Sequence, residues 1–263
     1  MPAPSPCSTP STLAAGCTLL ACIALAGCAS PGPTTSVRGT LDPAAPHVEP
    51  VAPVTSVCGH SHQNRPIEYQ QWGFGPTRVL VLATMHGDEP AGTPLVEHML
   101  EHLAHEEFRL ASRLTLIIVP VVNPDGLAAG TRGNAADIDL NRDYPAANSR
   151  RVMRLEDVQP ETRAMIDLVE RFRPQRIVSI HQPIACIDWD GPARELAVSM
   201  AACCELPMRR LGARPGSLGS WAGVEKGIPV VTLELPAGAE RESAGSLWER
   251  YGDAMMAFIG YGL

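Results

Sequence analysis

Short apolar runs alternate with longer segments of helical periodicity along most of the chain. The runs cover residues 78–85, 114–122, 176–180 and 228–233. Their Val, Ile and Leu content is typical of strands buried on both faces. A further strand and turn are predicted over residues 66–75. Helices are predicted over residues 90–110, 160–171, 195–206 and 246–258. This alternation predicts an α/β fold around a parallel sheet.

Three of the four runs end beside a side chain that can do chemistry. His86 follows the first run, His181 the third and Glu234 the fourth. Parallel strands bring their carboxyl ends to one edge of the sheet, where α/β proteins bind ligands. Glu89 lies three residues after His86, and an imidazole and a carboxylate at this spacing can bind one tetrahedral zinc ion. We therefore expect these four side chains to share one crevice.

A long polar loop is predicted over residues 130–145. It has no apolar periodicity, and long loops inside compact domains are usually functional or disordered. It carries Arg132, Asp139, Asn141 and Arg142. Taken singly, the arginines fit ordinary surface charges and Asp139 fits a capping residue, so their significance depends on the rest of the chain.

Length and charge exclude some classes of function. The 263 residues suit one domain of catalytic size with appendages. The net charge of -7 argues against a nucleic-acid partner. Lys226 is the only lysine, which argues against Schiff-base chemistry.

The N-terminal region predicts an export signal. Residues 13–27 are apolar, too short to span a bilayer, and end in small residues. Leu25-Ala26-Gly27-Cys28 resembles a bacterial lipobox, although no Lys or Arg precedes the apolar run. This resemblance implies cleavage before Cys28, lipidation of its thiol and anchoring to a membrane of the cell envelope. Residues 1–28 are then the signal, 29–55 a disordered tether rich in Pro, Ser, Thr and Ala, and 56–263 the folded domain.

Four cysteines fall in the folded domain: Cys58, Cys186, Cys203 and Cys204. Disulfides persist in exported proteins, so Cys186 is a candidate partner for Cys203 or Cys204. Buried free thiols fit the sequence equally well.

Several motifs occur together in one order. They are His86-Gly-Asp-Glu89, Asn123-Pro-Asp-Gly126, Asp139-Leu-Asn-Arg142, then His181, and Glu234 in Leu-Glu-Leu-Pro. This combination resembles the M14 family of zinc carboxypeptidases. The resemblance implies a three-layer α/β/α fold with a mixed, largely parallel, twisted central sheet. Residues 181–186 and 215–221 resemble, more narrowly, the murein peptide amidases of that family.

The resemblance also implies the roles of the site residues. His86, Glu89 and His181 would hold one Zn²⁺ per chain and leave a fourth position open, as catalysis requires. Glu234 would be the general base that takes a proton from the attacking water. Arg132 would stabilise the oxyanion of the tetrahedral intermediate.

The long loop would supply the remaining functional groups. Asn141 and Arg142 would bind the carboxylate of the terminal substrate residue, because a guanidinium offers a bidentate fork. Asp139 would orient the first histidine ligand and fix its tautomer. Asp188 and Asp190, shortly after His181, are candidates to pair with a cationic amine of the substrate, although a solvated turn also explains them.

We therefore expect a zinc hydrolase, attached to a membrane through its lipid anchor, that cleaves the amide between γ-D-Glu and meso-diaminopimelate in murein peptides. Digestive carboxypeptidases of the family place a tyrosine between the last histidine ligand and the catalytic glutamate, and residues 182–233 contain none. Three alternatives remain. They are a carboxypeptidase for other C-terminal residues, a deacylase like aspartoacylase or succinylglutamate desuccinylase, and a zinc-carrying or peptidoglycan-binding lipoprotein without turnover.

Overall fold

The computed structural model describes residues 53–105, 111–149 and 153–263. The predicted signal with Cys28, most of the predicted tether and the end of the predicted 90–110 helix lie outside these ranges. Within them, no helix combines the length and apolarity needed to cross a bilayer.

One mixed sheet forms the centre of the described chain. Its strands are β1 (Val54–His60), β2 (Pro66–Trp72), β3 (Thr77–Leu82), β4 (Leu114–Val119), β5 (Arg176–His181), β6 (Ile184–Asp190) and β7 (Val230–Pro236). Their spatial order is β1-β2-β4-β3-β5-β7-β6. The four central strands are parallel, whereas β1, β2 and β6 pair antiparallel with their neighbours. The carboxyl ends of β3, β5 and β7 therefore lie side by side.

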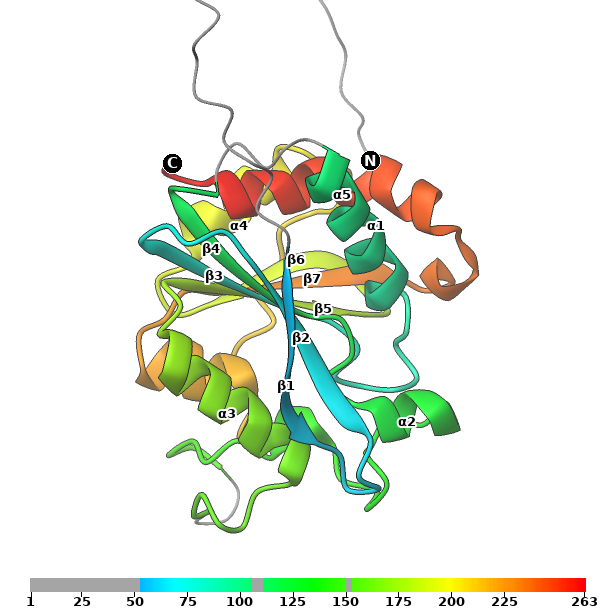
Figure 1. Ribbon diagram of the computed structural model, residues 1–263, viewed down its shortest axis with the longest axis vertical. Coiled ribbons are helices and arrows are strands. Elements are labelled where there is room, and N and C mark those ends of the chain that lie inside the picture. The colour runs from blue at the N-terminus through cyan, green and yellow to red at the C-terminus, as the bar shows by residue number, and fades with distance from the viewer. Residues whose placement is uncertain (1–52, 106–110, 150–152) are drawn as a thin grey trace, which may run out of the picture. The chain divides into compact units, whose positions relative to one another are not determined.

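Helices cover both faces of the sheet (Figure 1). They are α1 (Gly92–His105), α2 (Pro124–Ala129), α3 (Pro160–Phe172), α4 (Arg194–Ala201) and α5 (Ala244–Gly260). Two short 3₁₀ helices, η1 (Leu140–Arg142) and η3 (Ala239–Arg241), and a π-helix, η2 (Gly219–Glu225), complete the set. One apolar core joins α1, α4 and α5 to the sheet, and a second joins α3 and η2 to the opposite face. These three layers are the arrangement that the sequence predicted.

The predicted buried strands are confirmed as β3, β4, β5 and β7, but the edge strand β6 was missed. Its residues do not form a continuous apolar run, because Asp188 and Asp190 are buried among them. The solvated turn considered for these two residues is therefore wrong.

The start of the folded domain also needs a correction. We expected the tether to run to residue 55, but β1 begins at Val54, which pairs with Gln71 of β2. Most of β1 is exposed or half-buried, so its side chains show little of the hydrophobic pattern by which strands are recognised.

Two other boundaries differ from the prediction. Strand β3 ends at Leu82 rather than residue 85, because Thr84 adopts a positive φ of 51° that turns the chain. Helix α4 ends at Ala201 rather than residue 206.

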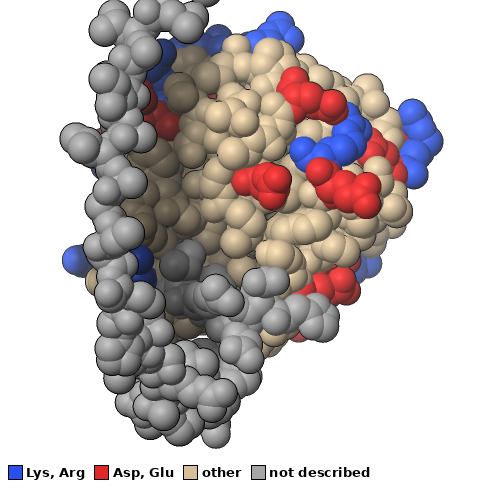
Figure 2. Space-filling view, turned by 90° about the horizontal axis from the view of Figure 1, so that it is seen from above, with Lys and Arg blue, Asp and Glu red and all other residues tan. Residues whose placement is uncertain are grey.

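Acidic and basic side chains lie beside each other on the side of the molecule seen in Figure 2, over a largely uncharged surface. Similar mixing occurs around α5, where Arg250 forms ion pairs with Glu205 and Glu242. Ion pairs at the surface contribute little to stability, on the order of 0–1 kcal/mol each.

Candidate active site

The turn between β3 and α1 carries His86 and Glu89, as predicted. The backbone N–H of Glu89 donates to the carbonyl of His86 at 3.2 Å. Gly87, between them, lies against Gly126, and a Cβ on Gly87 would come within 1.9 Å of the Gly126 carbonyl carbon. The turn therefore depends on close contact between two glycine backbones.

The Asn-Pro-Asp-Gly motif forms the start of helix α2. Asn123 caps helix α2, accepting a hydrogen bond from the N–H of Gly126 at 2.8 Å. Asp125 accepts from Ser61 Oγ and from the N–H of Gln63, both at 2.8 Å. The motif thus joins the β1–β2 connection to the segment that supports the His86 turn.

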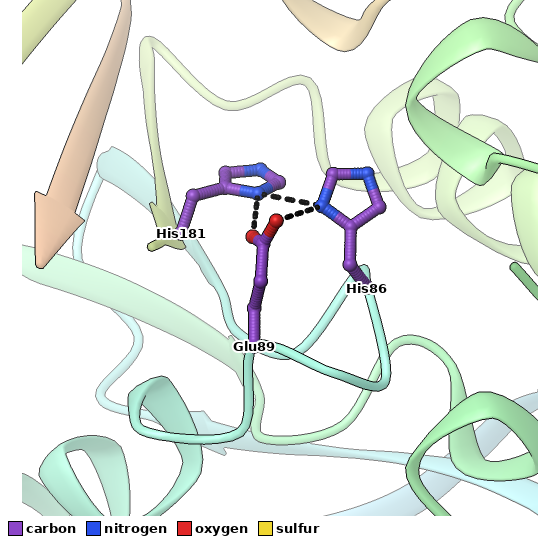
Figure 3. Close-up of side chains that lie close together, drawn as sticks. All are labelled: His86, Glu89 and His181. Atoms are coloured by element: carbon purple, nitrogen blue, oxygen red, sulfur yellow. Dashed lines mark hydrogen bonds and ion pairs between the residues drawn. The ribbon is translucent and has the colours of Figure 1, made fainter. Parts of the chain in front are cut away.

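His86, Glu89 and His181 point toward one another (Figure 3). His86 Nδ1 lies 3.0 Å from Glu89 Oε1, and His181 Nδ1 lies 2.9 Å from Glu89 Oε2. The two Nδ1 atoms are 3.2 Å apart. All three side chains are buried, with exposed fractions of 2%, 6% and 4%.

The other ring nitrogen of each histidine is already engaged. His86 Nε2 lies 2.9 Å from Asp139 Oδ1, and His181 Nε2 lies 3.0 Å from Ser179 Oγ. A carboxylate accepts a hydrogen bond from the Nε2–H group, which leaves the Nδ1 lone pair free for a metal. The predicted contact of Asp139 with the first histidine is therefore present.

The donor atoms fit a zinc ion. A tetrahedral ion with bonds of about 2.0–2.1 Å separates its ligand atoms by about 3.3 Å, close to the observed spacing of 2.9–3.2 Å. The three residues form the group of possible metal ligands found in the described part of the chain. The two imidazole nitrogens face each other and the carboxylate, so either a proton or a cation must lie between them. Zinc suits this position, because imidazole nitrogen and carboxylate oxygen are among its usual ligands.

Electrostatics favour the metal-binding form of the carboxylates. Burial alone would raise the pKa of Glu89, but hydrogen bonds from His181 and His86 hold that pKa far below its usual range. Burial would likewise raise the pKa of Asp139, but its contacts with His86 and Arg132 lower it strongly. Both side chains are therefore ionised at neutral pH.

Glu234 lies beside the histidines on the neighbouring strand. It pairs directly with His181 in the register between β7 and β5. Its side chain is 8% exposed, and Oε2 has no hydrogen-bond partner within the described residues. Burial raises the pKa of Glu234. A carboxylate with a raised pKa and a free oxygen is suited to accept a proton.

Arg132 lies over the same group of residues. Its Nη1 donates to Glu89 Oε1 at 2.7 Å and its Nε donates to Asp139 Oδ2 at 3.1 Å. These contacts use two of the five N–H donors of a guanidinium. The half-exposed side chain therefore keeps donors for a substrate oxygen.

Asn141 and Arg142 line the same cavity from helix η1. Asn141 Oδ1 accepts a hydrogen bond from the N–H of Leu218 at 2.9 Å, which orients the amide and leaves its NH₂ group as the donor for a substrate. Arg142 Nη1 donates to the carbonyl of Asn141 at 2.5 Å. Helix η1 is capped by Asp139, so one carboxylate serves both the histidine and this helix.

A buried polar anchor holds the loop that carries these residues. Asn134 Nδ2 donates to Glu161 Oε2 at 3.0 Å, and Asn134 Oδ1 accepts from the N–H groups of Ala136 and Ile138. Glu161, at the start of α3, is fully buried. The anchor fixes the loop to α3 from inside.

The motifs converge on a cavity of about 200 Å³. The predicted site residues that line it are His86, Glu89, Arg132, Asn141, Arg142, His181, Asp188, Asp190 and Glu234. Asp139 lies behind His86 instead.

Two residues of the site were not predicted. Ser179 bonds His181, and the backbone N–H of Gln182 donates to Glu89 Oε2 at 3.2 Å. The signal for Ser179 was present, because residues two apart on a strand share a face. The candidate disulfides are not formed: Cys58, Cys186, Cys203 and Cys204 are free thiols.

The chain is similar to known peptidases and amidases. The sequence model of the zinc carboxypeptidase family, Peptidase M14, matches residues 50–187. Murein peptide amidase A of Escherichia coli (strain K12) is 35% identical over 178 residues, which are 60% of this chain and 70% of that protein. Murein peptide amidase A of Vibrio campbellii is 32% identical over 204 residues, which are 70% and 77% of the two chains.

A solved structure agrees with these matches. The crystal structure of murein-tripeptide amidase from Escherichia coli O157 superimposes with a TM-score of 0.61 at 28% identity, covering 81% of this chain and 96% of that one. The chain therefore belongs to the M14 family of zinc carboxypeptidases and is a hydrolytic enzyme of the zinc metallopeptidase type.

Proposed function

We propose that the enzyme hydrolyses the amide between γ-D-Glu and meso-diaminopimelate in murein peptides. Hydrolysis is supported above all by one observation. The three zinc-compatible donors, Glu234 with its free Oε2 atom, and the Asn141–Arg142 pair line one cavity. The choice of substrate is supported by the similarity to murein peptide amidases.

The residues of this chain would divide the reaction among them. When bound to His86, Glu89 and His181, zinc supplies a Lewis acid for the carbonyl and lowers the pKa of water to about 7. Glu234 accepts the proton of the attacking water and delivers it to the amine that leaves. The free donors of Arg132 stabilise the negative charge that develops on the carbonyl oxygen.

Substrate orientation would come from two further residues of the cavity lining. Asn141 and Arg142 bind the free carboxylate on the diaminopimelate centre next to the scissile amide, with the guanidinium forming two hydrogen bonds. This contact selects a terminal residue with a free carboxylate, so the enzyme would remove one residue at a time.

A comparison of two isomeric tripeptides tests this function. Zinc-loaded protein is incubated with L-Ala-γ-D-Glu-meso-diaminopimelate and with the α-linked isomer, and free diaminopimelate is measured by mass spectrometry. Release from the γ-linked peptide alone supports the proposal. Release from the α-linked isomer alone indicates a conventional carboxypeptidase. Release from neither contradicts the proposal and directs attention to deacylase substrates, such as N-acetylaspartate and N-succinylglutamate, or to a binding protein.

We also propose that the protein is exported and held at a membrane of the cell envelope through lipidated Cys28. The support is the sequence Leu25-Ala26-Gly27-Cys28 after an apolar run. Lipid attached to a cysteine thiol anchors a protein to a membrane without a spanning helix. Murein stem peptides occur in the envelope, where such an enzyme would meet them. Replacing Cys28 by Ser should move the protein from the membrane fraction to the soluble fraction; an unchanged distribution would contradict the anchor.

A further inference from the structure

The cavity continues beyond Glu234 along strands β7 and β6. In the antiparallel register, Cys186 lies opposite Glu234, Asp188 opposite Thr232, and Asp190 opposite Val230. Residues two apart on a strand share a face. Both aspartates therefore line the cavity at successive steps away from the predicted catalytic base.

Both aspartates are buried, and Asp190 is incompletely paired. Asp188 is 5% exposed and Asp190 is 6% exposed. Asp188 Oδ1 accepts a hydrogen bond from the N–H of Leu211 at 2.9 Å. Asp190 Oδ1 has no hydrogen-bond partner within the described residues. A buried carboxylate without a partner is costly, which is understandable where a ligand supplies the missing partner.

The surrounding backbone leaves space for Asp190. A Cβ on Gly219 would come within 1.9 Å of Asp190 Oδ2, and a Cβ on Gly223 within 2.8 Å of Asp190 Cβ. Both glycines lie on helix η2. Helix η2 therefore accommodates this carboxylate only because it presents glycine at both positions.

The cavity is lined by charges of both signs. Arg214 is an exposed residue that also lines the cavity, and its charge acts on Asp188 together with that of Arg210. A side chain that enters the cavity thus meets both a cation and two carboxylates. Such a surface complements a group that carries an ammonium and a carboxylate together.

The distances suit a long side chain. Successive residues of a strand are about 3.3 Å apart, so the Asp188 level lies about 7 Å from the Glu234 level, and the Asp190 level about 13 Å. An extended chain of five bonds, each about 1.5 Å long, spans about 6 Å from an α-carbon to a terminal amine. The distal end of a diaminopimelate or lysine residue therefore reaches the level of Asp188, the nearer aspartate, whereas a short side chain does not.

We infer that Asp188 binds the distal ammonium group of the terminal substrate residue, that Asp190 supports this contact with its negative charge from the next level of the strand, and that Arg214 binds the carboxylate on the same carbon. This inference rests on the proposed function and deepens it, because it states how the enzyme recognises diaminopimelate. A lysine residue offers the ammonium without the carboxylate, and a 2-aminopimelate residue offers the carboxylate without the ammonium. The two analogues therefore separate the contributions of the aspartates and of Arg214.

The test compares three γ-linked tripeptides on the full-length zinc-loaded protein. They carry meso-diaminopimelate, L-2-aminopimelate or L-lysine as the terminal residue. A site rejects an analogue strongly when that analogue leaves buried polar groups of the site unpaired. We therefore expect kcat/KM for the aminopimelate peptide to be about 100-fold or more below that for the diaminopimelate peptide. Asp190→Asn should reduce this ratio to below about tenfold, and Arg214→Gln should narrow the gap between diaminopimelate and lysine.

The control is Asp253→Asn, which removes the same charge from an exposed position on α5 and should leave every ratio unchanged. Zinc content of each variant reports whether the metal site is intact. If the wild type cleaves the diaminopimelate peptide but Asp190→Asn leaves the ratio unchanged, the inference is overturned and the proposed function stands. If the wild type cleaves none of the three peptides, the proposed function itself fails.

Discussion

His181 and Glu234 are direct partners in the register between the parallel strands β5 and β7. One residue belongs to the zinc-compatible group, and the other is the predicted general base. Their adjacency follows from sheet topology rather than from a flexible loop, so the base is held next to the metal site by backbone hydrogen bonds. Rigid elements of this kind position catalytic groups more accurately than loops do.

Replacing Glu234 by Gln should therefore separate catalysis from metal binding. The side chain keeps its size but loses its ability to accept a proton, so kcat should fall by about 100- to 10,000-fold. Zinc content, measured by mass spectrometry of the metal, should remain at one ion per chain. Loss of zinc together with activity would show that Glu234 is a ligand and that the assignment of roles is wrong.

Asp139→Asn should weaken zinc binding through His86. The carboxylate accepts from His86 Nε2 at 2.9 Å, and loss of such a partner lowers metal affinity by about 10- to 100-fold. Competition with a chelator measures the affinity. Asp137→Asn, an exposed change two residues earlier on the same loop, is the matched control. Equal affinities in the two variants would contradict this role for Asp139.

Much of this site could be predicted from the sequence, because its ligands follow apolar strands. His86, His181 and Glu234 were recognisable at the ends of Val- and Ile-rich runs, and parallel pairing brings those ends together. The contact of Gly87 with Gly126 could not be predicted, since it joins two turns that are far apart in the sequence.

Strand β6 was missed for a related reason. Its two aspartates are buried against η2 and the cavity, whereas charged residues usually indicate a solvated segment. The hydrophobic pattern fails where the chain keeps buried charge.

Asn134→Ala should destabilise the protein and reduce activity together. Its side chain bonds Glu161 and two backbone N–H groups inside the loop. Leaving a buried Glu161 oxygen without this partner costs about 1–3 kcal/mol. Urea unfolding measures the stability. An unchanged unfolding midpoint would show that the loop does not depend on this anchor.

Asp190→Asn should make the folded protein more stable at pH 7. Burial, together with the charge of Asp188, raises the pKa of Asp190 to about 6. The folded state therefore binds the proton of Asp190 more tightly than the unfolded state does. The contribution of this group to the stability of the fold falls as pH rises from about 4 through 6. We expect the neutral variant to gain about 1–2 kcal/mol at pH 7 and little at pH 4.

Thermal unfolding at the two pH values measures this gain. A lower melting temperature for Asp190→Asn than for the wild type at pH 7 would show that the Asp190 carboxylate has a stabilising partner in the protein. It would then count against a role of this carboxylate in binding a ligand.

A zinc titration of the metal-stripped wild type tests the central claim most directly. Release of diaminopimelate from L-Ala-γ-D-Glu-meso-diaminopimelate is followed as zinc is added in steps. The account predicts no release without metal and a linear rise that ends at one zinc ion per chain. Release by the stripped protein, or none at one equivalent of zinc, would contradict it.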